Sequence, residues 1–340
     1  MKGMDIYKGI ALATAAAALL FAVNRLTRQE TEASETQPVM AYLETVPEPA
    51  LETEPETVPT EEPASPAELA CEEAGAKVTA GHVFVYDVSE RQMLYCSTAS
   101  TDRLYPASIT KLFSAWVALQ LLEPDTVVTA GWELGLLQPG SSTAFISLDS
   151  RLTVEMLVEA MLLPSGNDAA YVLAAAAGRE AAGDPKLSAK KAVAAFIDEM
   201  NRMAGEVGLA NSHFENPDGY HDENHYSCPG DLATIGELAL GNDIIAKYAR
   251  TQQDAVTFAS GETITWYNTN RLLNPESAWY CESAVGLKTG YTKEAGYCLL
   301  AAFQGTEGPV LVGIFDAENT LSRYSDAANL FKAANDPGDP

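Results

Sequence analysis

Residues 29–66 most constrain where this chain can form a packed core, because they lack the apolar side chains that a core needs. The stretch consists mainly of Glu, Pro and Thr, and the tetrapeptide Glu-Thr-Val-Pro occurs at Glu44 and again at Glu56. Burying so little apolar surface does not offset the entropy lost on ordering, so we expect disorder here. Prolines and like charges favour an extended chain. The sequence therefore predicts a tether over residues 29–66 and a folded domain after it, over residues 67–335.

The N-terminal segment, residues 1–28, has the pattern of an export signal. Lys2 and Lys8 precede an uncharged run from Gly9 to Val23 that is rich in Ala and Leu. Such a run is short for a membrane span and typical of the apolar part of a secretion signal. No convincing small-x-small cleavage site follows it. We therefore expect an exported protein that keeps this segment as an N-terminal membrane anchor.

The charge of the chain argues against a nucleic-acid partner. There are 47 Asp and Glu against 21 Lys and Arg, a formal net charge of −26, and 13 of the Glu lie between Gln29 and Ala76. A phosphate backbone needs Lys and Arg, and here it would meet repulsion. Nucleic acid is therefore excluded from the expected partners.

The five cysteines contain no Cys-x-x-Cys pair, so the sequence predicts neither a structural zinc site nor a thioredoxin-like motif. Because five is odd, at least one thiol is free or pairs between chains. One or two disulfides and a set of small buried side chains are both open interpretations. The residues are Cys71, Cys96, Cys228, Cys281 and Cys298.

The order of secondary-structure patterns predicts the fold class. Helical patterns occur at residues 66–76, 108–122, 153–163, 168–177, 189–205, 229–240 and 319–334, and β-rich runs occur at 82–87, 92–96, 284–288, 297–303 and 309–315. Strands at both ends with helices between them indicate an α+β domain. We expect one antiparallel sheet, made of the N- and C-terminal strands and flanked by helices.

A serine and a lysine lie at the start of the second helical pattern. In Tyr105-Pro106-Ala107-Ser108-Ile109-Thr110-Lys111, the proline disfavours helix before it, which predicts a helix that begins at Ser108. Lys111 lies three residues further on the same face. A serine hydroxyl becomes a nucleophile when a base takes its proton, and a lysine of lowered pKa can be that base. A plain N-cap is the alternative, and Ser188–Lys191 repeats the spacing on what we interpret as surface helix.

Two further motifs follow along the chain. Ser165-Gly166-Asn167 occupies the turn between two helical patterns, where a helix cap would explain it equally well. Lys288-Thr289-Gly290 ends a strand pattern and leads into a turn, where a plain hairpin would also fit. Each motif alone is weak. Ser-x-x-Lys, Ser-x-Asn and Lys-Thr-Gly in this order are typical of penicilloyl serine transferases.

On these motifs the sequence resembles the low-molecular-weight penicillin-binding proteins that act as serine D-alanyl-D-alanine carboxypeptidases. The resemblance covers roughly residues 82–315. Ser-Gly-Asn rather than Ser-Asp-Asn, and the lack of a Glu-x-x-Leu-Asn stretch between Asn167 and Lys288, favour carboxypeptidases over class A β-lactamases. Many members carry a C-terminal all-β domain, which we do not expect here. The flanking segments that carry the resemblance are 161–170, 214–219, 225–227, 268–273 and 286–292.

The resemblance implies a substrate, a place and a set of catalytic residues. The substrate is a peptidoglycan stem peptide ending in D-Ala-D-Ala, β-lactams are inhibitors, and no metal or organic cofactor is needed. The place is the extracytoplasmic face of a bacterial membrane or the cell wall. Ser108 is the nucleophile, Lys111 is the general base, and Ser165 passes a proton to the leaving D-Ala amine.

The resemblance also implies how substrate is held. Asn167 is expected to position Lys111 and the substrate amide, and Lys288 with Thr289 to hold the terminal carboxylate. The backbone N–H of Tyr291 joins that of Ser108 in an oxyanion hole, and the peptide lies as an added strand along 289–291, which includes Gly290. Lys288 is further expected to lower the pKa of Lys111 as a nearby like charge.

Three other functions remain open. His213, His221 and His225 lie near Asp218, Asp222 and Glu223, which suggests a zinc peptidase; however, the stretch reads His-Asp-Glu-Asn-His, not His-Glu-x-x-His, and its composition predicts a loop. A β-lactamase-like hydrolase and a penicillin sensor that is acylated without turnover would use the same serine and lysine.

Overall fold

The structure, a computed structural model, describes residues 63–337, so the predicted signal and most of the predicted tether lie outside the described residues. The fold begins at α2 (Pro66–Gly75). Ser65 caps this helix: its hydroxyl accepts from the Glu68 N–H at 3.2 Å, and the Glu68 carboxylate accepts from the Ser65 N–H at 2.6 Å. Proline at the first helical position suits this start. From Ser65 onward the described residues form one compact unit.

A five-stranded antiparallel sheet confirms the predicted fold class. Its strand order is β2-β1-β9-β8-β7, so the strands from the two ends of the domain form one sheet. The strands are β1 (His82–Asp87), β2 (Gln92–Cys96), β7 (Ala284–Thr292), β8 (Gly296–Gln304) and β9 (Pro309–Ala317). β7 lies at one edge, where its outer side has no neighbouring strand in the described sheet.

The sheet is buried on both faces because alternate residues along each strand face opposite sides. In β9, Leu311 and Phe315 belong to the larger hydrophobic cluster, while Val312 and Ile314 belong to a second one. The second cluster packs under α9 (Ser322–Asn335), which also contacts α2. The larger cluster joins the sheet to the helical part of the domain.

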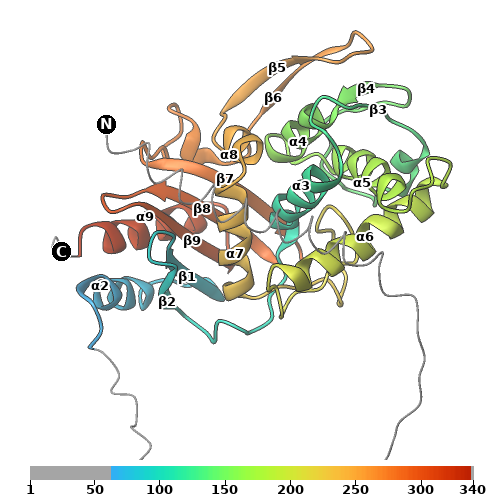
Figure 1. The fold of residues 1–340 in the computed structure, drawn as a ribbon. Helices are drawn as coiled ribbons and strands as arrows, with labels where there is room; N and C mark the ends of the chain where they lie inside the picture. The colour runs from blue at the N-terminus through green and yellow to red at the C-terminus, as the bar shows by residue number, and fades with distance from the viewer. Residues whose placement is uncertain (1–62, 338–340) are drawn as a thin grey trace, which may run out of the picture. The chain divides into compact units, whose positions relative to one another are not determined.

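Helices between the sheet halves gather beside the sheet (Figure 1). α3 is buried on nearly its whole surface, which its Ala-rich and apolar sequence allows. No helix in residues 63–337 is long and apolar enough to cross a bilayer. The helices are α3 (Thr110–Leu121), α4 (Val154–Leu162), α5 (Asn167–Ala181), α6 (Ala189–Glu206), α7 (Pro229–Leu240) and α8 (Asp243–Ala249).

Several short elements were not predicted from the sequence. β5 and β6 form a hairpin that projects from the domain in Figure 1. β7 also continues past its predicted end at residue 288, to Thr292. The unpredicted elements are β3 (Val127–Thr129), β4 (Arg151–Thr153), β5 (Gln253–Thr257), β6 (Thr263–Tyr267), α8 and the 3-10 turns η1 (Ala107–Ile109), η2 (Trp132–Leu136) and η3 (Arg271–Leu273).

The cysteines are all free, which decides between the two interpretations left open by the sequence. Cys71, Cys228 and Cys298 are buried, and Cys96 and Cys281 are half-buried. In this structure they act as small buried side chains.

Candidate active site

Ser108 and Lys111 are in direct contact. Lys111 Nζ donates a hydrogen bond of 2.8 Å to Ser108 Oγ. Ser108 lies in the 3-10 turn η1, and α3 begins two residues later, so the predicted helix start is shifted. The spacing of three residues still brings both side chains to one face, because a 3-10 turn superposes residues i and i+3. Ala107, just before the serine, has a φ of +48°, and this left-handed residue turns the chain into the helix.

Lys111 is poised to be a base. Its side chain is fully buried, and burial lowers the pKa to about 8, against the opposing attraction of Asp218 and Asp168. Burial is therefore the leading cause, and the expected like-charge repulsion between the two lysines is found on Lys288, whose pKa is lowered by burial and by Lys111. Near pH 8 a substantial fraction of Lys111 is neutral and can accept the Ser108 proton.

The loop 214–219 holds Lys111 from the other side. The backbone carbonyl of Asp218 accepts from Lys111 Nζ at 2.8 Å, and the carbonyl of Pro217 accepts from the Ser114 hydroxyl at 2.7 Å. Gly219 has a φ of +80°, and a Cβ there would lie 1.8 Å from the Ala107 carbonyl oxygen. The loop is thus packed directly against the turn that carries Ser108. The segment 214–219 is one of those that carry the family resemblance in the sequence, but its backbone contact with Lys111 was not predictable.

Gly219→Ala is expected to lower the free energy of unfolding by about 3 kcal/mol and to slow acylation, because the added Cβ displaces Ala107 and strains a left-handed backbone. Thermal unfolding and penicillin acylation measure the two effects. Gly208→Ala is the matched control: it has a φ of +85° with no atom within 4 Å of the added Cβ, so only the backbone strain, about 1 kcal/mol, applies. Equal losses in both variants would show that the close approach to Ala107 is unimportant.

Ser165-Gly166-Asn167 leads into α5, but neither Ser165 nor Asn167 caps it, since the N-cap is Gly166 without a side-chain bond. Ser165 has a φ of +63°, and its carbonyl accepts from the Ser142 hydroxyl at 2.6 Å. The Asn167 amide bonds to the Ser141 and Ser142 hydroxyls at 3.1 and 3.3 Å. Among the hydrogen bonds of residues 63–337, none joins Asn167 to Lys111, so the expectation that Asn167 positions Lys111 stays a prediction.

Burial raises the pKa of the Asp218 carboxyl, and the Asn167 amide is the smallest of the contributions that lower it. The next residue, Asp168, is buried, and its carboxylate accepts from the N–H groups of Ala144 and Ile146 at 2.8 and 2.9 Å. Asp168 therefore fixes the segment that carries Ser141 and Ser142 against the start of α5. Sequence analysis did not identify this role.

Lys288, Thr289 and Gly290 lie in β7 beside the nucleophile. A Cβ on Gly290 would lie 3.0 Å from the Ser108 nitrogen, so the strand backbone adjoins the turn η1. Lys288 is 1% exposed and donates to the Thr289 carbonyl at 3.1 Å. Burial, together with the charges of Lys111 and Arg323, lowers its pKa well below the ordinary value. The predicted oxyanion partner, Tyr291, has a side chain that is 57% exposed.

Two residues that support β7 were missed by sequence analysis. Arg323 in α9 donates to the Gly290 and Cys298 carbonyls at 3.3 and 3.1 Å. Thr269 shares a hydrogen bond of 2.6 Å between its hydroxyl and that of Thr289. For Arg323, the sequence signal that could have indicated its role is an arginine on the otherwise apolar face of the closing helix, α9. The structure thus brings the first and third motifs together directly, and the second through Asp218.

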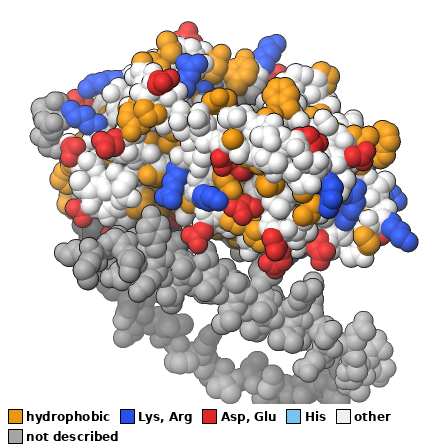
Figure 2. All heavy atoms as spheres, turned by 90° about the horizontal axis from the view of Figure 1, so that it is seen from above, with side chains coloured by type: hydrophobic (Ala, Val, Ile, Leu, Met, Phe, Trp, Pro, Cys, Tyr) orange, Lys and Arg blue, Asp and Glu red, His pale blue; other side chains and the backbone are white. Residues whose placement is uncertain are grey.

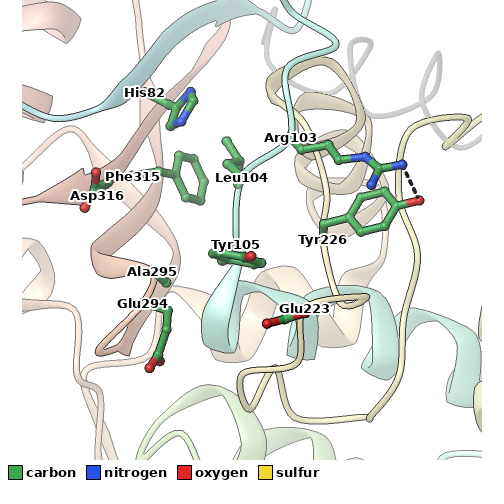
Figure 3. A pocket seen from close by; sticks show the side chains of 10 residues that line it. All are labelled: His82, Arg103, Leu104, Tyr105, Glu223, Tyr226, Glu294, Ala295, Phe315 and Asp316. Carbon is green, nitrogen blue, oxygen red and sulfur yellow. Dashed lines mark hydrogen bonds between the residues drawn. The ribbon is translucent and has the colours of Figure 1, made fainter.

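A pocket opens next to this site, beside Tyr105 (Figure 3). The Arg103 guanidinium lies 3.8 Å from the Tyr226 ring centroid and donates to its hydroxyl at 3.1 Å. Glu223 and Glu294 line this pocket from two different loops and lie on either side of Tyr105 in Figure 3. Elsewhere acidic and basic side chains are interspersed on the face seen in Figure 2.

Two of the three histidines considered for zinc have hydrogen-bond partners, and the third, His221, packs edge-on against the Tyr105 ring at 4.8 Å between centroids while its Nδ1 has no hydrogen-bond partner among the described residues. His225 is buried, its Nδ1 accepts from the Glu215 N–H at 3.2 Å, and its Nε2 bonds to the Thr110 hydroxyl at 2.8 Å. Burial lowers its pKa to about 3, so it is neutral. His213 Nδ1 bonds to the Asn224 carbonyl at 2.9 Å. Within the described part of the chain, no three His, Cys, Asp or Glu side chains stand close enough together to hold a metal ion.

Comparison with known proteins gives consistent relatives. A family model described as D-alanyl-D-alanine carboxypeptidase matches residues 68–319. A D-alanyl-D-alanine carboxypeptidase of Streptomyces sp. strain K15 is 33% identical over 248 residues, which are 70% of this chain and 80% of that protein. D-alanyl-D-alanine carboxypeptidase DacF of Bacillus subtilis is 28% identical over 242 residues, 69% of this chain and 57% of its own length. The chain thus spans between about half and four fifths of such relatives.

Solved structures share the fold. The crystal structure of the Streptomyces K15 DD-transpeptidase matches with a TM-score of 0.67 at 28% identity, covering 76% of this chain and 97% of that one. Penicillin-binding protein D2 of Listeria monocytogenes, solved with ampicillin bound, matches with a TM-score of 0.61 at 24% identity, covering 76% and 98%, a likeness of fold.

Proposed function

The chain belongs to the D-alanyl-D-alanine carboxypeptidase family, and we propose that it is a serine-type peptidase that removes the terminal D-Ala from peptidoglycan stem peptides. The observation that carries this proposal is the hydrogen bond of 2.8 Å between Lys111 Nζ and Ser108 Oγ, made by a lysine whose pKa burial lowers to about 8. A serine beside a partly neutral amine is an activated nucleophile.

The reaction begins at the carbonyl of the penultimate D-Ala. Ser108 Oγ attacks this carbon while Lys111 Nζ takes the hydroxyl proton, which gives a tetrahedral oxyanion. The backbone N–H groups of Ser108 and Tyr291 stabilise the oxyanion, and removing one such donor typically costs about 3 kcal/mol. Ser165 relays the proton to the departing amine, D-Ala leaves, and water then hydrolyses the ester on Ser108. β-Lactams acylate the same hydroxyl.

Substrate binding uses the edge strand β7. Its unpaired side accepts an extended peptide as an added strand along residues 289–291. Lys288 and Thr289 hold the terminal carboxylate. Burial lowers the pKa of Lys288, and the negative charge of the bound carboxylate raises it again, so that the amine is protonated when substrate is bound. Asn167 orients the substrate amide. Arg323 supports this arrangement by holding the Gly290 carbonyl from behind the strand.

The protein acts outside the cytoplasm. The apolar run from Gly9 to Val23 serves as signal and membrane anchor, and residues 29–66 separate it from the enzyme domain. Its substrates are then within reach in the cell wall. Carbonate extraction and protease accessibility of the full chain in membranes test this placement.

Incubation of the full chain with a pentapeptide ending in D-Ala-D-Ala is expected to release one equivalent of free D-Ala per peptide, measured with D-amino acid oxidase. A matched peptide ending in L-Ala should keep its full mass, measured by mass spectrometry, because D-amino acid oxidase does not detect L-Ala. Rapid penicillin turnover without D-Ala release would instead identify a β-lactamase-like hydrolase. A stable penicillin adduct without D-Ala release would identify a sensor.

A further inference from the structure

The carboxyl group of Asp218 has no use in the mechanism above, although it is buried beside the reacting groups. The residue is 1% exposed. Its Oδ1 accepts from the Tyr220 N–H at 3.3 Å, while Oδ2 has no hydrogen-bond partner. A buried carboxyl with an unsatisfied oxygen destabilises a fold, so its presence calls for a physical reason.

Asp218 is tied to Lys111 in two ways. Its backbone carbonyl accepts from Lys111 Nζ at 2.8 Å, which holds the amine at Ser108. Its side chain attracts the charged amine and raises the pKa of Lys111, against the larger lowering by burial. In return Lys111 lowers the pKa of Asp218, which burial raises. The base therefore lies between two opposing effects: burial lowers the pKa of Lys111, and the carboxylates of Asp218 and Asp168 raise it, with Asp218 the larger contributor of the two.

We propose that Asp218 is a positioning residue whose backbone carbonyl fixes Lys111 at Ser108 and whose buried side chain is the acidic neighbour of that amine. This inference rests on the proposed function, in which neutral Lys111 is the general base. The other charged or titratable groups that act on the pair are Asp168 and Tyr171 from α5, Lys288 from β7 and His225 from the loop before α7. None of them also contributes a hydrogen bond to Lys111 among the described residues, so Asp218 is the one to test.

Asp218→Asn removes the charge and keeps both the backbone carbonyl and an oxygen for the Tyr220 N–H. The rate of acylation by benzylpenicillin is followed by intact mass from pH 5 to pH 10. In the wild type it should rise with a midpoint near 8, as Lys111 becomes neutral. Without the opposing carboxylate the midpoint should fall by on the order of one pH unit. At pH 6 the acylation rate of the variant, expressed as a fraction of its own high-pH plateau, should then be roughly tenfold larger than the same fraction for the wild type.

Asp222→Asn is the matched control, since it removes one charge from an exposed position in the adjoining loop and keeps the contact to the Asn224 N–H. Its midpoint should equal that of the wild type. An Asp218→Asn midpoint within 0.2 units of wild type, at about the precision of such a profile, would overturn the proposal.

A second measurement does not depend on activity or on the variant's folding. In the full chain carrying Ser108→Ala, the ¹³C signals of the Lys111 ε-carbon and the Asp218 carboxyl are titrated together. Coupled groups share titration steps. The chemical shift of the Asp218 carboxyl should change at the midpoint of the Lys111 titration. An Asp218 chemical shift that stays constant through that midpoint would contradict the inference. A wild type that releases no D-Ala would remove the proposed function while leaving this titration readable.

Discussion

Ser108→Ala is expected to reduce the release of free D-Ala by roughly 10⁴-fold or more, since no other described hydroxyl is held by the neutral-prone amine of Lys111. The substitution removes the bond-forming oxygen and leaves the backbone N–H of the oxyanion hole in place. Substrate binding along β7 should therefore survive, so kcat falls while KM changes little. D-Ala release under saturating and limiting pentapeptide separates the two constants.

Ser188→Ala is the control that the chain itself offers. Ser188 and Lys191 repeat the Ser-x-x-Lys spacing at the start of α6, where Ser188 makes no side-chain capping bond and Lys191 is exposed. This variant should retain wild-type release of D-Ala. A Ser108→Ala protein that stays active would mean that the Ser-x-x-Lys motif at Ser108, like the one at Ser188, has no catalytic role.

Lys111→Met is expected to have the second largest effect, slowing acylation by about 10²–10⁴-fold, the usual contribution of general base catalysis. Methionine has a similar length and suits a fully buried position. The substitution leaves the buried Asp218 carboxyl without its charge partner and removes two hydrogen bonds, so the free energy of unfolding should fall. The rate of adduct formation with penicillin is the measurement, and thermal unfolding shows that the fold persists.

The comparison variant is Lys191→Met, an exposed lysine in the duplicate motif. Acylation there should proceed at the wild-type rate. In the Lys111→Met protein the rate should also lose its rise with pH near 8, because the titrating base is gone. A pH profile that keeps this rise would assign the titration to another group and remove Lys111 from the proposed role.

Much of the fold was predictable because its elements are long and their apolar patterns are clear. The strands 82–87 and 92–96 and the helix 229–240 have the predicted bounds, and α6 differs by one residue. The misses are short or exposed. β3 and β4 have three residues each, and β5 has mostly exposed residues. Neither their length nor an alternation of apolar and polar residues was therefore sufficient to predict a strand. Their pairing comes from tertiary contact, which local pattern does not encode.

The candidate site divides along a similar line. Ser108, Lys111 and Lys288 were predicted as site residues because each is expected to act through its side chain. A sequence motif consists of side-chain identities, so it identifies such residues. The Asp218 contribution through a backbone carbonyl and the Arg323 contribution from the far end of the chain were not predictable, since each depends on how distant segments meet. The predicted role of Asn167 in positioning Lys111 stays untested, since the hydrogen bonds of its side chain go to Ser141 and Ser142.

Peptide mapping after penicillin labelling tests the central claim most directly, because it asks which oxygen is acylated. Trypsin cuts after Arg103 and Lys111, so Ser108 lies in the peptide Leu-Tyr-Pro-Ala-Ser-Ile-Thr-Lys, residues 104–111, in which it is the one serine. We expect the full chain to carry a single penicilloyl group, found on Ser108 in this peptide and absent after Ser108→Ala. A label on any other peptide, or equal labelling of the two proteins, would contradict an active site built on Ser108 and Lys111.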